Sequence, residues 1–265
     1  ILEMRKTYNR TNGDSGAFII AQNSSFGVDR RFPNQFPIWC DLFDQLGKAG
    51  VVSIAAGPNS VVDIDDVGDI PCTCPSDYLV TVTRSDEQDK LFGGGFGKES
   101  IDLAAPGKQI FTTSPINSTS QAGGSSFAAP MAAAALGLMY ASYPQRFFST
   151  SADSMALKSA TYLKQSVELF PEFEDITASG GRLDLFKSTS LAQAAPPLST
   201  NIKQSLSIST RVYPNPSKGS FTFETTSFGI LELYDLKGVL ILKKDIQSTN
   251  AFIETQGLAN GMYVL

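Results

Sequence analysis

The chain has 265 residues and contains no histidine. A reaction that needs an imidazole base therefore cannot be completed by these residues alone. Charged residues are also scarce, at 18% against the roughly 25% usual for soluble domains. The formal net charge is −5 and no basic patch is present, which argues against a nucleic-acid partner.

Long apolar runs and simple cysteine motifs are absent too. The longest apolar stretch, residues 127–140, is broken by Pro130 and is too short to form a transmembrane segment. Cys40, Cys72 and Cys74 include no pair with the two-residue spacing of a zinc or redox motif. Two interpretations stay open: a bridge from Cys40 to Cys74 or Cys72 in an exported protein, or three buried or free thiols.

Strand and helix patterns alternate in the first part of the chain. Three apolar runs predict buried strands, at 17–21, 51–56 and 78–83. Three patterns with helical spacing predict helices, at 37–50, 131–140 and 154–168. This alternation is typical of an α/β fold with a doubly wound parallel sheet covered by helices on both faces.

The composition changes near residue 194. Residues 194–205 have the Pro, Ala and Ser content of a linker. Beyond them only short strand patterns with turn signals occur, which predicts a small β-sandwich. We therefore expect an α/β domain over residues 1–193, a linker over 194–205 and a β-sandwich over 206–265.

Both ends of the sequence have features that are typical of a truncated chain. The chain opens on Ile1 with no signal peptide, and it stops at Leu265 within a strand pattern. We expect a fragment whose α/β domain is truncated at its N-terminus and whose sandwich is truncated at its C-terminus.

A glycine bend leads directly into the Ala-rich helix at residues 123–130. Ser126 lies there, where free N–H groups and the helix dipole favour developing negative charge. That position suits a nucleophile whose reaction passes through an oxyanion. The alternative is a serine that only caps the helix.

Chain order distinguishes two classes of serine hydrolase. In α/β-hydrolases the acid and the histidine follow the serine, and the absence of any histidine after Ser126 argues against that class. In the order aspartate, histidine, serine, both partners precede the nucleophile. A chain that starts downstream of them would keep the serine alone.

The segment Gly124–Pro130, with Ser125 where threonine is usual, resembles the nucleophile motif of the subtilisin-like serine peptidases. The resemblance covers about residues 10–193 and implies a subtilisin-like fold with Ser126 as the catalytic nucleophile. It also implies that Asn59 donates to the oxyanion, although Pro58 is an insertion relative to the family motif.

The same resemblance implies a substrate-binding site. It assigns the strand that pairs with the substrate backbone, and the residues that line the cleft for the side chain before the scissile bond. These are Ser25, Phe26 and Gly27 for the strand, and Ala55, Ala56 and Gly57 for the cleft. The alternatives are an ordinary loop asparagine at position 59 and an ordinary strand end at 25–27.

An acidic loop carries Asp63, Asp65, Asp66 and Asp69. Calcium loops place carboxylates at alternate positions, but Val67 occupies a position that should ligate, and no glutamate follows at the twelfth place. We therefore expect a solvated loop, no metal site and no cofactor, with calcium only weakly supported.

The last segment resembles the sorting domain of type IX secretion in certain Gram-negative bacteria. The matching stretches are 212–219, 233–240 and 258–265. The resemblance implies recognition by outer-membrane secretion machinery and a secreted or cell-surface location. The alternative is a plain accessory sandwich, for example for carbohydrate, although this module contains no tryptophan.

Together these features predict a secreted serine endopeptidase that hydrolyses protein or peptide substrates through an acyl-enzyme. This chain would be an inactive fragment without the catalytic histidine and aspartate. The alternative function is a non-catalytic subtilisin-like scaffold or surface-binding protein.

Overall fold

The computed structural model describes residues 1–115, 117–195, 210–214, 217, 219–225, 229–235, 240–255, 257–258 and 263–264. The chain forms two compact units, Ile1–Ser199 and Thr200–Leu265. Most of the expected linker at 194–205 lies outside the described residues, which stop at Ala195 and resume at Thr210.

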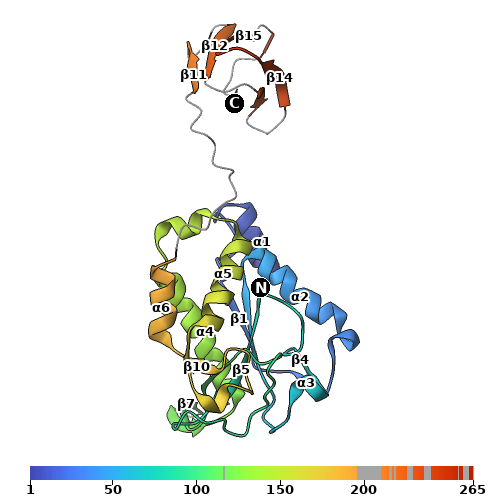
Figure 1. Ribbon diagram of the computed structural model, residues 1–265, viewed down its shortest axis with the longest axis vertical. Helices are drawn as coiled ribbons and strands as arrows, with labels where there is room; N and C mark the ends of the chain where they lie inside the picture. Colours follow the sequence, from blue (N-terminus) through green and yellow to red (C-terminus); the bar gives the residue numbers. More distant parts are fainter. Residues whose placement is uncertain are drawn as a thin grey trace. The chain divides into compact units, whose positions relative to one another are not determined.

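A six-stranded sheet forms the centre of the first unit (Figure 1). The strand order is β1-β3-β5-β6-β10-β9, with the first five parallel and β9 antiparallel to β10. The bounds are β1 Ala21–Ser24, β3 Val52–Ala56, β5 Leu79–Ser85, β6 Leu103–Pro106, β10 Gly181–Leu183 and β9 Val167–Leu169. The expected α/β class with a mostly parallel sheet is confirmed.

Helices pack on both faces of this sheet because successive strand side chains point in opposite directions. Val52 and Ile54 of β3 belong to a core shared with α4, α5 and α6. Val51 and Ala55 belong to a second core on the face covered by α2. The helices are α1 Leu2–Arg10, α2 Pro37–Ala49, α3 Ile64–Val67, α4 Ser125–Ser142, α5 Ala152–Gln165 and α6 Leu185–Gln193.

Several short elements connect this framework. They are β2 Val28–Asp29, β4 Asp69–Ile70, β7 Ile110–Ser114, β8 Ser118–Ala122 and the 3₁₀ turns η1 Pro33–Gln35, η2 Gln145–Ser149 and η3 Pro171–Phe173. β2 pairs with β4, and β7 pairs with β8. The second pair is a hairpin that ends two residues before α4, so it leads the chain into the helix start.

The expected strand at 17–21 is wrong, because β1 covers Ala21–Ser24 instead. The N–H of Ala17 donates to the carbonyl of Met4 at 3.2 Å, and the N–H of Ile19 donates to the carbonyl of Ala17 at 3.0 Å. These bonds join the apolar run to α1 and within itself. Pairing with β3 therefore begins only at Ala21.

Two of the three predicted helices, 131–140 and 154–168, have wrong ends. α4 begins at Ser125 and not at residue 131, so Pro130 lies inside the helix and does not mark its start. α5 ends at Gln165 and not at 168, because the next residues form β9, where the Glu168 carboxylate accepts from Arg182 Nη2 at 2.8 Å. Among the described residues, no helix is long and apolar enough to cross a membrane.

A disulfide joins Cys40 of α2 to Cys74, and Cys72 is a free, buried thiol. Of the pairings left open by the sequence, the structure therefore contains the bridge to Cys74. Burial raises the pKa of the Cys72 thiol well above its usual value, with the Asp69 carboxyl adding to the effect. A thiol that stays protonated is a poor nucleophile, so Cys72 is a packing residue.

The second unit contains two three-stranded antiparallel sheets, β11-β12-β15 and β14-β13-β16. Their bounds are β11 Thr210–Tyr213, β12 Ser220–Thr225, β15 Asn250–Glu254, β14 Leu240–Ile246, β13 Gly229–Asp235 and β16 Tyr263–Val264. Phe221 and Ile253 from one sheet share a core with Leu231 and Ile246 from the other, as in a β-sandwich. Parts of the expected sorting pattern, at 236–239 and 259–262, lie outside the described residues.

Two glycines in helices allow a matched test of the packing. A Cβ on Gly47 in α2 would lie 1.9 Å from Cγ of the Tyr78 ring, whereas one on Gly137 in α4 would meet nothing within 4 Å. We expect Gly47→Ala to lower the free energy of unfolding by about 1–3 kcal/mol through overpacking. Gly137→Ala should raise it by about 0.5–1 kcal/mol through helix propensity. Urea unfolding of both variants checks this, and equal effects would contradict the packing described.

Candidate active site

A close backbone crossing positions the start of α4. The N–H of Gly124 donates to the carbonyl of Gly107 at 2.8 Å, and Gly124 has φ of +150°. A Cβ on Gly107 would lie 2.9 Å from the Gly124 oxygen and 2.5 Å from the Cβ of Arg84. Glycine at 107 therefore permits the contact that places Ser125 and Ser126 in the first turn of the helix.

Ser125 joins this helix start to the loop after β3. Its N–H donates to Oδ1 of Asn59 at 3.0 Å, and its hydroxyl donates to the carbonyl of Gly57. Ser125 is fully buried, whereas Asn59 is exposed. Because the Asn59 amide oxygen is already occupied, the –NH₂ group of this side chain is left as the donor for another partner.

Ser126 is half-buried and follows in the first helical turn. N–H groups at this position have no acceptor within the helix. The –NH₂ nitrogen of Asn59 lies beside Gly124, two residues before Ser126, because it would be 3.7 Å from a Cβ placed on Gly124. The site thus places a hydroxyl beside two donors, a free backbone N–H and a side-chain amide. Donors of these two kinds stabilise a tetrahedral oxyanion.

The segment after β1 passes the same helix start. The hydroxyl of Ser25 donates to the carbonyl of Ser126 at 3.0 Å. Phe26 is 62% exposed, and its ring stacks on that of Trp39 with centroids 6.0 Å apart. Gly27 lies against β4, because a Cβ there would be 2.5 Å from the carbonyl oxygen of Ile70.

The three residues expected to line the cleft are placed differently from one another. Ala55 and Ala56 are buried in the two opposite cores of the sheet. Gly57 reaches the site through its backbone. Its N–H donates to the carbonyl of Val82 at 3.0 Å, and its carbonyl accepts from the Ser125 hydroxyl. The structure therefore brings Gly57 to the helix start and keeps the alanines in the strand.

Sequence reasoning missed the role of Ser125. A residue next to a nucleophile has no spacing signal of its own. The available signal was a second hydroxyl in the glycine bend, at a position where the family uses threonine.

The acidic loop uses its carboxylates within the fold. Asp63 Oδ1 accepts from the N–H of Asp65 at the start of α3. The Asp65 carboxylate accepts from the N–H groups of Glu99 and Ser100, at 2.8 and 2.9 Å. In the described part of the chain, no group of three or more acidic, cysteine or histidine side chains could hold a metal ion.

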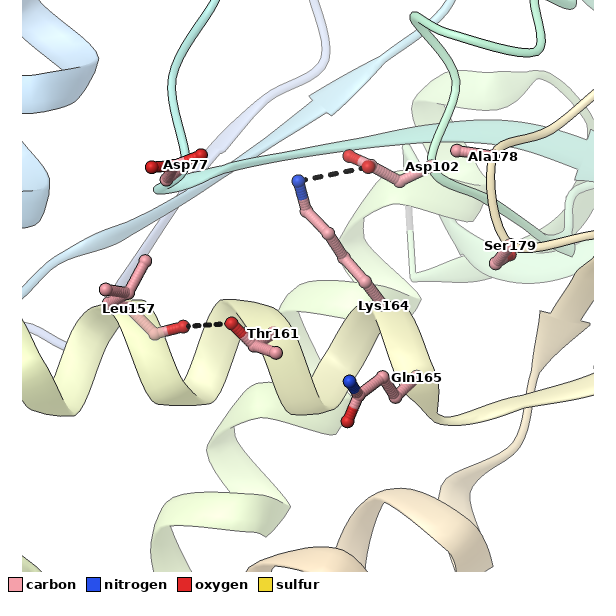
Figure 2. Close-up of a pocket in the computed structure, with 8 residues that line it drawn as sticks. All are labelled: Asp77, Asp102, Leu157, Thr161, Lys164, Gln165, Ala178 and Ser179. Atoms are coloured by element: carbon pink, nitrogen blue, oxygen red, sulfur yellow. Dashed lines mark hydrogen bonds and ion pairs between the residues drawn. The ribbon is translucent and has the colours of Figure 1, made fainter. Parts of the chain in front are cut away.

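A separate cavity of about 370 Å³ lies near the amino ends of β5 and β6 (Figure 2). Lys164 Nζ and Asp102 Oδ1 form an ion pair at 3.0 Å within it. Asp102 and Asp77 precede β6 and β5, so they lie at the amino ends of these strands. The chain reaches Ser25 and Asn59 only after the carboxyl ends of β1 and β3, so the cavity is distinct from the candidate active site.

Comparison with known proteins identifies the family. The subtilase family model matches residues 4–202, and the model of the secretion system C-terminal sorting domain matches residues 211–265. The chain therefore belongs to the subtilase family and ends in a secretion system sorting domain. Both expected resemblances are confirmed.

Individual relatives agree with this result. Subtilisin-like protease 1 of Plasmodium falciparum is 33% identical over 97 residues, which are 37% of this chain and 13% of the relative's length. The self-cleaved protease domain of PatA has a TM-score of 0.54 at 21% identity, over 73% of this chain and 68% of that one. The A-subunit of the AB5 toxin from E. coli has a TM-score of 0.53 at 18% identity, over 71% and 66%. The two structures establish the shared fold.

Asp69 supports the segment beside the site through the short β2–β4 ladder. It pairs with Asp29, is 2% exposed, and its Oδ2 has no hydrogen-bond partner among the described residues. Burial raises the pKa of Asp69 from 3.8 to about 6; the nearby Cys72 opposes this shift, and the charge of Asp29 adds to it. The buried carboxyl therefore favours the neutral form.

This shift predicts a pH-dependent stability. Because the folded-state pKa is the higher one, the stabilising contribution is full below pH 3.8 and is lost as the pH rises through about 6. Between pH 5 and pH 8 the free energy of unfolding of the wild type should fall by about 1.4 kcal/mol relative to that of Asp69→Asn. Urea unfolding across this range measures the difference, with Asp66→Asn as an exposed control. A difference that stays constant with pH would refute the assignment.

Proposed function

We propose that this chain carries the nucleophile and the oxyanion-binding groups of a secreted serine endopeptidase. The observation that carries the proposal is the joint placement of Ser126 and Asn59 through the Ser125 hydrogen bonds. Ser126 Oγ attacks the carbonyl carbon of a peptide bond, and the N–H of Ser126 with the Asn59 amide stabilises the oxyanion. Loss of one such donor typically raises the barrier by about 3–4 kcal/mol.

The proton of Ser126 needs an acceptor that these residues do not supply. The sequence contains no histidine, and a serine hydroxyl is a weak nucleophile without an adjacent base. We propose that the catalytic histidine and its aspartate come from outside these 265 residues. This chain alone is then inactive as a triad peptidase.

The substrate would bind as an extended strand along residues 25–27. This segment continues from β1, which is the edge strand of the sheet within the described residues. An extended peptide can add to such an edge through main-chain hydrogen bonds. In this arrangement Ser25, Phe26 and Gly27 form one wall of the site. The backbone of Gly57 lies at the base of the cleft for the side chain before the scissile bond, whereas Ala55 and Ala56 are buried in the two cores and support it from within the strand.

The sorting domain supports a secreted or cell-surface location. Its family description is that of a secretion system C-terminal sorting domain. We propose that outer-membrane type IX machinery of a Gram-negative bacterium recognises this unit, and that the peptidase acts outside the cell. Its substrates are then extracellular proteins or peptides.

A second function is a non-catalytic subtilisin-like scaffold that binds at the cell surface. The absence of histidine favours it for this chain taken alone. The two functions differ in one property: only the peptidase requires Ser126 to react as a nucleophile. An added base can therefore distinguish them.

The test measures hydrolysis of an activated peptide ester by this chain with and without imidazole. Without imidazole, the wild type should match Ser126→Ala. With imidazole, we expect about tenfold faster hydrolysis by the wild type than by Ser126→Ala, a fraction of the about 10²–10⁴ that a positioned general base supplies.

The control is Ser120→Ala, in the exposed part of β8, which should behave as the wild type. Thermal melting must show that Ser126→Ala remains folded. Equal rates for the wild type and Ser126→Ala in imidazole would support the scaffold. Turnover in the absence of imidazole that requires Ser126 would contradict the proposed source of the base.

A further inference from the structure

The carbonyl of Ser126 lacks the hydrogen bond that a helix normally provides. In an α-helix this carbonyl would accept from the N–H four residues later, and that residue is Pro130. Proline has no N–H, so the acceptor beside the nucleophile is left open. The gap lies in the first turn, where the position of Ser126 is determined.

Ser25 supplies the missing donor from a distant part of the chain. Its hydroxyl donates to the Ser126 carbonyl at 3.0 Å, across 101 positions of sequence. The Nδ2 of Asn23 donates to the same Ser25 oxygen at 2.9 Å, which orients the hydroxyl proton toward the helix. The neighbouring Ser24 behaves differently, because its hydroxyl donates to Gln22 Oε1 at 3.0 Å within β1.

We infer that Ser25 is a positioning residue that fixes the peptide unit of the nucleophile in place of the N–H that Pro130 lacks. The inference rests on the proposed nucleophilic role of Ser126 and adds a role for Ser25 beyond substrate binding. The bond also ties the substrate-binding segment 25–27 to the nucleophile. Movement of that segment therefore changes the backbone position of Ser126.

A thiol at position 126 can test this without a histidine. Ser126→Cys introduces a nucleophile whose thiolate is stabilised by N–H groups of the first turn. Cys40 and Cys74 form the disulfide and Cys72 is buried, so the introduced thiol is the accessible one among the described residues. Its alkylation by iodoacetamide, followed as a function of pH, reports the apparent pKa and the placement of this group.

In the Ser126→Cys background, we expect Ser25→Ala to slow alkylation at pH 7 by about threefold and to raise the apparent pKa of the introduced thiol. Ser25→Thr keeps a hydroxyl and should restore the rate. Ser24→Ala is the matched control and should leave it unchanged. With Pro130→Ala, the alanine N–H can bond the Ser126 carbonyl, and the effect of Ser25→Ala should disappear.

Two results would overturn the inference. One is an unchanged pH profile in Ser25→Ala, which would leave Ser25 as a substrate contact only. The other is an undiminished effect of Ser25→Ala in the Pro130→Ala background, which would show that the hydroxyl does not replace the missing N–H. If Ser25→Ala does not fold by itself, the role of Ser25 is decided by Ser25→Thr and by Ser25→Ala in the Pro130→Ala background. Alkylation needs no turnover, so this outcome is independent of the imidazole test.

Discussion

The hydrogen bonds of Ser125 are the contacts on which the candidate active site depends. The hydroxyl holds the carbonyl of Gly57 and the N–H holds the amide oxygen of Asn59, so the end of β3 is joined to the start of α4. The same contacts leave the Asn59 –NH₂ free to donate. The backbone and side chain of one buried residue thus determine both the position of the helix start that carries Ser126 and which end of the Asn59 side chain is available.

The parallel sheet explains why these groups meet. Carboxyl ends of parallel strands lie at one edge, which is where open α/β folds place their ligands. β1 delivers residues 23–25 to that edge, β3 delivers Gly57 and Asn59, and β6 delivers Gly107. The amino ends carry the Lys164–Asp102 pair instead.

The sequence predicted the parts of the fold that depend on local pattern. The buried run at 51–56 and the helix after Pro37 were predicted because burial on two faces and helical spacing leave clear signals. The start of β1 was not, since it depends on hydrogen bonds between Ala17 and α1. The disulfide partner of Cys40 stayed open because two candidate cysteines lie two residues apart. Ser126 could be inferred from its motif, whereas the bonds of Ser125 and Ser25 are contacts across more than 60 residues.

Amide hydrogen exchange at Ser125 is the most direct measurement of the central claim. This N–H lies in the first helical turn, where no helical acceptor exists, so Asn59 Oδ1 is its hydrogen-bond acceptor. We predict that the Ser125 amide is protected in the wild type and that Asn59→Ala raises its exchange rate by about tenfold or more, since a lost hydrogen bond of about 1.4 kcal/mol is a factor of ten. Rapid exchange in the wild type, or exchange that Asn59→Ala does not change, would contradict the account.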